Sequence, residues 1–266
     1  MIPLEISSKR DLLSNHCSPP DYAPDSIASD IIPKHNEFLR EVDLMNHLPW
    51  HPNICKFIGY CDISDGDMFL CYEYLPGGSL HGLIMDSSQT YNVLKIASDI
   101  ASGMAFLHHH GIMHRDLKSS NVMLDTSNDA ETDSDQPLTA KQKLWHGKSK
   151  LSDFGLSCLL YAGRDMTSET GTYRWMAPEI IRHETYSFPA DVYSFGILLW
   201  ELIAREHPFA TLTPIQAAFS VAKHDLRPTI PSDVHPRLKA IITRCWHPVP
   251  LARPSFDEIV DLLGQV

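Results

Sequence analysis

Apolar residues recur three or four positions apart between residues 36 and 48, which predicts a helix along that stretch. Two prolines follow at once and end it, because proline cannot continue a helix. Residues 54–61 and 68–74 are rich in β-branched and aromatic side chains, so they predict two strands joined by a polar turn. By contrast, residues 1–35 contain several prolines and little periodicity, which is typical of a loop or linker.

The pattern becomes mainly helical after residues 76–78, which read Pro-Gly-Gly and are typical of a hinge. Residues 93–109 carry an apolar stripe. Residues 191–204 are apolar on nearly all sides, so they predict a buried central helix. Shorter helices are predicted for residues 213–222, 235–245 and 255–263.

A long polar stretch, residues 125–149, interrupts what should be a short pair of strands. Its first half is acidic and its second half is basic. We expect a solvated insertion here, since such a segment buries too little apolar surface to fold by itself. Leu144 and Trp145 inside it offer a contact for a partner, although a solvated loop is the usual outcome.

Charge and composition narrow the classes of protein. The formal net charge of −11 argues against a nucleic-acid partner, because binding to a phosphate backbone needs basic residues. The 6 cysteines have no regular spacing, which favours reduced thiols and a cytoplasmic, intracellular protein. No apolar run approaches the length of a membrane span, and the longest, around residues 195–204, contains Glu201.

Three short motifs follow one another in the helical part. Residues 114–121 read HRDLKSSN, residues 153–155 read DFG, and residues 177–179 read APE. In this order they match the phosphoryl-transfer signature of protein kinases. From about Asn36 to the C-terminus, the chain therefore resembles a eukaryotic protein kinase domain.

Further residues narrow this resemblance to the tyrosine-kinase-like group, which includes Raf-like and mixed-lineage kinases. They are GTYRWMAPE at residues 171–179, Cys245-Trp246, and RPSF at residues 253–256. Most members of the group phosphorylate serine or threonine. The resemblance implies a two-lobed α+β fold. Residues 1–75 would form a partial N-lobe with a small antiparallel sheet and one helix, and residues 76–266 a mainly α-helical C-lobe.

The resemblance also implies a role for each matching residue. Asp116 would be the base that orients the substrate hydroxyl, Lys118 the phosphate contact, and Asn121 and Asp153 the ligands of Mg²⁺. Tyr72, just before the hinge, would narrow the back of the adenine pocket. The remaining assignments are Glu41, Glu73, Leu75 and Lys9 for ATP binding, Thr167, Ser168, Thr170 and Thr172 for the activation segment, and Arg115, Glu179, Asp191 and Arg253 for structure.

Parts of the kinase pattern are missing upstream. No glycine-rich loop precedes Glu41, since Gly59 is the first glycine of the chain, and no V-A-I-K strand occurs. Lys34 is too close to Glu41 to lie on the preceding strand, so Lys9 is the candidate for the strand lysine. Three interpretations stay open: a fragment of an active kinase, a degraded kinase that binds nucleotide poorly, and a pseudokinase that serves as a scaffold.

The predicted function is that of a protein serine/threonine kinase in intracellular signalling, with ATP and Mg²⁺. Its partners would be a protein substrate and an upstream activating kinase. A phosphate on the activation segment would pair with Arg115 and order the segment. The alternative is a non-catalytic signalling scaffold that binds its partners through the C-lobe.

Overall fold

The computed structural model describes residues 38–39, 41–63, 67–126, 143–145, 147–154, 157–159 and 173–266. Residues 1–35, with the candidate Lys9, lie outside these ranges, as do the activation-segment residues Thr167, Ser168, Thr170 and Thr172. Within the described ranges, no helix combines the length and the apolar character that crossing a membrane requires.

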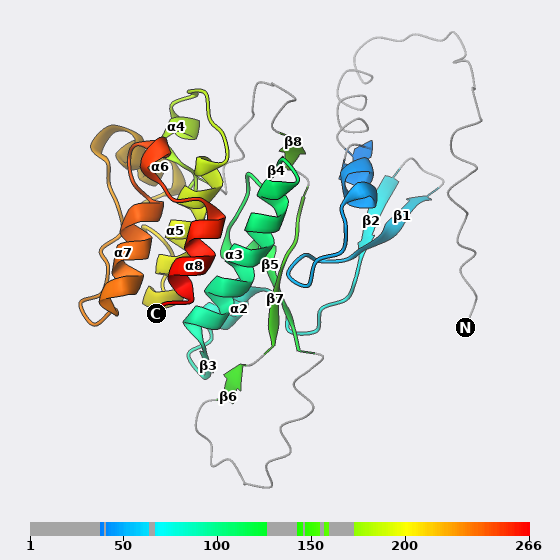
Figure 1. Cartoon of the computed structure of the whole chain (residues 1–266), viewed down its shortest axis with the longest axis horizontal. Coiled ribbons are helices and arrows are strands. Elements are labelled where there is room, and N and C mark those ends of the chain that lie inside the picture. The colour runs from blue at the N-terminus through cyan, green and yellow to red at the C-terminus, as the bar shows by residue number, and fades with distance from the viewer. Residues whose placement is uncertain are drawn as a thin grey trace, which may run out of the picture. The chain divides into compact units, whose positions relative to one another are not determined.

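The small lobe contains a helix over residues 41–47 and a two-stranded antiparallel sheet, drawn in blue and cyan in Figure 1. The strands are β1 (Phe57–Ile63) and β2 (Asp67–Tyr72). Tyr60 pairs with Leu70 in the sheet, and its ring meets that of Phe38 edge-on at 5.9 Å. One face of the sheet therefore lies toward the helix, and the predicted helix and strand pair are both confirmed.

The first strand begins at Phe57, three residues later than predicted. Ile54 instead forms an isolated bridge with Leu151, and the Cys55 amide donates to the Leu151 carbonyl at 2.8 Å. Ile54 and Cys55 are both buried. The apolar run is continuous in sequence, but its first residues pair with Leu151 and the rest form β1. Local periodicity cannot predict where one contact ends and the other begins.

A turn at residues 76–78 follows the small lobe, and Gly78 there has a φ of 69°, which favours glycine. Next come α2 (Leu80–Met85), whose N-terminus is capped by the Ser79 side chain, and β3 (Gln89–Tyr91). Neither element was predicted from the sequence, because so few residues show no clear period. Ser79 was the one usable start signal.

The large lobe is mainly helical (Figure 1). Its helices are α3 (Val93–His109), α4 (Pro178–Ile181), α5 (Pro189–Ala204), α6 (Pro214–His224), α7 (Pro236–Cys245) and α8 (Phe256–Leu263), with 3₁₀ turns at Ser119–Asn121 and Pro250–Ala252. The predicted central helix, α5, is buried along most of its length. At Gly196 a Cβ atom would lie 2.8 Å from Cys245 Cβ, so glycine lets α5 and α7 approach closely.

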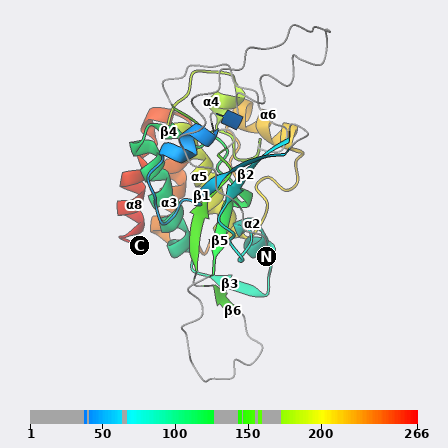
Figure 2. The same cartoon turned by 90° about the vertical axis from the view of Figure 1, so that its right-hand side faces the viewer.

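Short strands complete the large lobe. β4 (Ile112–Met113) pairs with β8 (Cys158–Leu159), and β5 (Val122–Asp125) pairs with β7 (Lys148–Leu151). β6 (Lys143–Trp145) runs parallel to β3, and the two lie together below β5 in Figure 2. Strand pairing thus reaches further into the polar stretch than its composition suggested. Trp145 is only 8% exposed, because burying an indole ring is favourable.

Candidate active site

Residues 114–121 form a loop between β4 and β5 that the central helix holds in place. Asp191, in the first turn of α5, accepts hydrogen bonds from the backbone N–H groups of His114 (2.9 Å) and Arg115 (2.8 Å). Burial raises the pKa of Asp191, but His108, 2.9 Å away, and the Arg115 amide outweigh it and hold the pKa below its usual value. Arg115 has a φ of 70°, so Asp191 stabilises a strained backbone.

The two carboxylate oxygens of Asp116 have different surroundings. Oδ2 accepts hydrogen bonds from Lys118 Nζ at 2.6 Å and from Asn121 Nδ2 at 2.9 Å. Oδ1 is buried and has no hydrogen-bond partner among the described residues. One oxygen of Asp116 is therefore left to accept a hydrogen bond or a proton from a bound molecule.

Asn121 and Asp153 come together through the pairing of β5 with β7. Just outside the last pair, the Ser152 amide donates to the Asn121 carbonyl at 2.9 Å. The Asn121 Nδ2 also donates to the Asp116 carbonyl at 2.9 Å. Asp153, the next residue after Ser152, is exposed and has a φ of 62°. Two oxygen-bearing side chains thus stand at the same end of one strand pair.

These oxygens match the chemistry of magnesium. Among the described residues, no three histidine, cysteine, aspartate or glutamate side chains gather into a group that would hold a metal. Mg²⁺ is usually bound by one or two protein carboxylates together with phosphate oxygens and water. Asn121 and Asp153 therefore fit a metal ion that arrives with a nucleotide.

Glu73 and Leu75, the predicted hinge contacts, offer backbone groups. The Glu73 carboxylate accepts hydrogen bonds from Lys150 Nζ at 2.9 and 3.0 Å, and Lys150 Nζ is also 3.0 Å from Asp125 Oδ2. Burial lowers the pKa of Lys150, but the two carboxylates outweigh it and raise the pKa. In the described part of the chain, the Glu73 carbonyl and the Leu75 amide have no hydrogen-bond partner. These two groups remain available to a ligand.

Glu41, the predicted helix glutamate, is held by a residue of the small-lobe sheet. Its Oε1 accepts a hydrogen bond from the Tyr72 hydroxyl at 2.8 Å. Burial raises the pKa of Glu41, and the hydrogen bond from Tyr72 opposes this shift. The negative charge of Asp153 also raises the pKa of Glu41, so the two carboxylates lie near one another.

Residues 27–263 match the family model described as protein tyrosine and serine/threonine kinase. The chain belongs to this family. It is 38% identical over 233 residues to the serine/threonine-protein kinase STY17 of Arabidopsis thaliana. The aligned region covers 86% of this chain and 37% of the relative. For the serine/threonine/tyrosine-protein kinase HT1 of the same plant, the identity is 40% over 232 residues, covering 85% of this chain and 54% of the relative.

A third relative is serine/threonine-protein kinase STY46 of Arabidopsis thaliana, 36% identical over 91% of this chain and 39% of its own length. The kinase domain thus spans between 37% and 54% of the length of these relatives. The resemblance to the tyrosine-kinase-like group and the two-lobed α+β fold are confirmed. Protein kinases in general use ATP and Mg²⁺.

The structure brings the predicted structural residues Glu179 and Arg253 of this kinase domain together. The Arg253 guanidinium donates two hydrogen bonds to the Glu179 carboxylate, at 2.6 and 2.9 Å. It also donates to the carbonyls of Pro189 and His247. The pair therefore connects α4, the start of α5 and the segment before α8.

Sequence reasoning missed Glu201, a second buried anchor of the kinase domain. Its side chain is fully buried in α5 and accepts hydrogen bonds from Ser119 Oγ at 2.7 Å and from Trp175 Nε1 at 3.0 Å. His81 Nδ1 lies 3.6 Å from its Oε1. Glu201 thereby joins the loop of Asp116 to the segment before the APE motif. Its available signal was a single charge inside an apolar helix.

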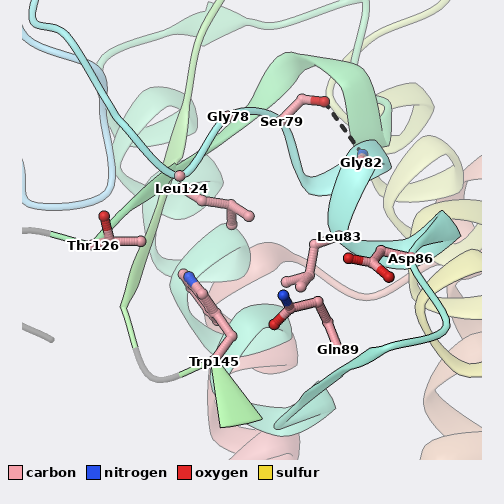
Figure 3. Close-up of a pocket in the computed structure, with 10 residues that line it drawn as sticks. Gly78, Ser79, Gly82, Leu83, Asp86, Gln89, Leu124, Thr126 and Trp145 are labelled. Carbon is pink, nitrogen blue, oxygen red and sulfur yellow. Dashed lines mark hydrogen bonds between the residues drawn. The ribbon is translucent and has the colours of Figure 1, made fainter. Parts of the chain in front are cut away.

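A pocket of about 560 Å³ lies beside α2, and Figure 3 shows the residues that line it. Leu83, Leu124 and Trp145 contribute apolar side chains to its lining, and Asp86 and Gln89 contribute polar ones. The residues of the HRD and DFG motifs do not line it. This pocket is therefore separate from the arrangement around Asp116.

Proposed function

We propose that this kinase domain transfers the γ-phosphate of ATP to serine or threonine hydroxyls of a protein substrate. The observation that carries the proposal is that Oδ1 of Asp116, beside Lys118 Nζ, has no hydrogen-bond partner among the residues that the structure describes. Oδ1 would accept the proton of the substrate hydroxyl, whose oxygen attacks the γ-phosphorus while the bond from phosphorus to the ADP oxygen breaks. Lys118 would stabilise the negative charge on the transferring phosphate.

We propose a position for the nucleotide from the protein groups that could bind its adenine ring and its phosphates. The Glu73 carbonyl and the Leu75 amide, which have no hydrogen-bond partner within the described ranges, would pair with a donor and an acceptor on the adenine ring. Asn121 and Asp153 would hold Mg²⁺, which when bound neutralises charge on the phosphates. Lys9 stays our prediction for the strand lysine that pairs with Glu41 and the phosphates.

Serine or threonine is the proposed acceptor. STY17 and STY46 are named serine/threonine kinases, whereas HT1 is named a serine/threonine/tyrosine kinase. Lys118 stands where the resemblance places a lysine typical of serine/threonine kinases. Thr172 would help to hold the substrate hydroxyl near Asp116.

We also propose control by an upstream kinase inside the cell. Arg115 Nε is buried and has no hydrogen-bond partner among the described residues. A phosphate on Thr167, Ser168 or Thr170 would supply acceptor oxygens for such a donor. The expected consequence is an ordered activation segment.

The competing proposal is a non-catalytic signalling scaffold that binds its partners through the large lobe. The test measures transfer of labelled phosphate from ATP to a generic protein substrate, with Asp116→Asn as the control. We expect transfer by the native chain and a fall of about 10²–10⁴-fold in the variant at unchanged thermal stability. No transfer by a folded native chain would support the scaffold, and equal transfer by both proteins would exclude Asp116 as the base.

A further inference from the structure

The carboxylate of Glu201 is fully buried in α5, and its two hydrogen-bond donors are neutral. Oε1 accepts a hydrogen bond from Ser119 Oγ at 2.7 Å, and Oε2 accepts one from Trp175 Nε1 at 3.0 Å. Within the described ranges, no lysine or arginine forms an ion pair with this carboxylate, and the basic group beside it is Nδ1 of His81, 3.6 Å from Oε1. A buried carboxylate is costly without a compensating positive charge, and His81 is placed to supply one.

His81 reaches this carboxylate from α2 and lies close to both atoms of one hydrogen bond. Its Nδ1 is 3.4 Å from Ser119 Oγ and 3.6 Å from Glu201 Oε1. Its side chain is 34% exposed, so it can exchange protons with solvent. The hydrogen bond to Glu201 raises the pKa of His81. The ring of His207 lies 5.0 Å away, but burial, together with the positive charge of Arg174, lowers the pKa of His207, so His81 is protonated first.

Ser119 begins the short 3₁₀ turn that carries Asn121. The Asn121 amide closes this turn by donating to the Lys118 carbonyl at 3.0 Å. The Ser119 hydroxyl connects the start of the turn to α5 through Glu201. At the end of the turn, Asn121 Nδ2 donates to the Asp116 carbonyl and to Asp116 Oδ2, both at 2.9 Å. A displacement of Ser119 would therefore move Asn121 relative to Asp116.

We propose that Ser119 is a positioning residue for Asp116 and Asn121, and that Glu201 holds it through a contact which His81 strengthens when it carries a proton. This inference rests on the proposed kinase function. The protonated Nδ1 would donate to the oxygen of Glu201 or of Ser119 and would balance the buried charge. The neutral ring would leave the carboxylate with neutral donors alone.

The direction of the pH dependence follows from the raised pKa of His81. The stabilisation by His81 should be fully present below pH 6.5 and should be lost as the pH rises through the raised pKa. Phosphate transfer by the native chain should therefore lose a contribution from His81 at high pH. A role of His81 in packing alone would show no such dependence.

Ser119→Ala removes the hydroxyl, and Ser194→Ala is the matched control. Ser194 is also buried, and its hydroxyl donates to the Trp175 carbonyl at 2.8 Å, so each variant loses one buried hydrogen bond. We expect Ser119→Ala to lower kcat about tenfold, equivalent to about 1.4 kcal/mol, with the KM for the protein substrate unchanged. Ser194→Ala should leave both constants close to their native values. Equal kcat in the two variants would overturn the proposal.

A pH profile tests the part played by His81. His81→Gln removes the titrating group, and His235→Gln is the control, since His235 is exposed and its side chain makes no cap hydrogen bond to α7. The ratio of native kcat to His81→Gln kcat should be about threefold below pH 6.5 and should approach one as the pH rises. In a Ser119→Ala background this ratio should no longer depend on pH, because the two residues act as one unit. A native ratio that does not change with pH, or that matches the His235→Gln ratio, would refute the role of His81.

A third readout does not depend on activity. The Asn121 amide is protected by its hydrogen bond to the Lys118 carbonyl, so its exchange with deuterium reports on the turn. We expect this amide to exchange about tenfold faster in Ser119→Ala than in Ser194→Ala. If the native chain transfers no phosphate, the proposed function fails, and the exchange rates still decide whether Ser119 holds the turn. Equal exchange in the two variants would refute that role.

Discussion

Removing the positive partner of the buried Glu179–Arg253 pair should destabilise the kinase domain strongly. Both side chains are almost inaccessible to solvent, with 0% of Arg253 and 3% of Glu179 exposed. Arg253→Met keeps the apolar length of the side chain but leaves the carboxylate without its two donors. Water cannot reach the carboxylate to replace them. An uncompensated buried charge of this kind costs about 3–5 kcal/mol.

The magnitude is large relative to the whole domain. Folded domains are stable by about 5–15 kcal/mol, so a loss of about 3–5 kcal/mol amounts to roughly a fifth of the total or more. With about 2–4 °C of melting temperature per kcal/mol for a domain of this size, the midpoint should fall by roughly 6–20 °C. The carbonyls of Pro189 and His247 also lose a donor, which adds to the cost.

Urea unfolding followed by far-ultraviolet circular dichroism measures this change, and Arg182→Met supplies the control. Arg182 makes the same two-bond contact with Glu184, at 2.7 and 3.0 Å, but 34% and 52% of the two side chains are exposed. Solvent screens this second pair, so its loss should cost far less. Equal losses in the two variants would refute the argument from burial. Glu179→Leu combined with Arg253→Met should be more stable than Arg253→Met alone, since no charge is then left unpaired.

Two further predictions concern stability. Gly103→Ala would add a helix-favouring residue to α3, but the new Cβ would lie 2.9 Å from the Asn53 carbonyl oxygen. We therefore expect the free energy of unfolding, measured in urea, to fall by about 1–2 kcal/mol. An increase would contradict this prediction and show that the contact relaxes easily. Burial lowers the pKa of His114, so the unfolded chain binds a proton that the folded chain refuses, and stability should fall as the pH drops below about 6.5. His114→Phe should flatten this pH dependence between pH 7 and 5, and an unchanged slope would contradict the assignment.

The helices were the part of the fold that the sequence predicted best. The stretch predicted at residues 93–109 matches α3 (Val93–His109), because its apolar stripe faces a single core. The helices near the C-terminus begin at clear signals, such as the capping boxes of Thr213 with Gln216 and Ser255 with Glu258. α2, α4 and the two- or three-residue strands were missed, since such short elements are formed by tertiary contacts and leave no period in the sequence.

The candidate site was predictable where its residues are close in sequence. Asp116, Lys118 and Asn121 stand within one loop, so their motif places them together before any fold is known. The hydrogen bond from Tyr72 to Glu41 spans 31 positions and could not be inferred from local pattern. The resemblance named Glu41 but supplied a lysine as its partner, and the tyrosine emerged only from the packing of helix on sheet.

Lys150 shows why charge patterning misleads in this chain. It belongs to a basic run, which composition alone predicts to be solvated. In the fold it forms ion pairs with Glu73, 77 positions earlier, and with Asp125, and only 11% of its side chain is exposed. A charged side chain can be half-buried when oppositely charged residues from distant parts of the chain pair with it. The local sequence does not reveal those partners. Ser149 and Leu151, the residues on either side of Lys150, are fully buried. β7 is therefore a strand with one buried face and not part of a solvated loop.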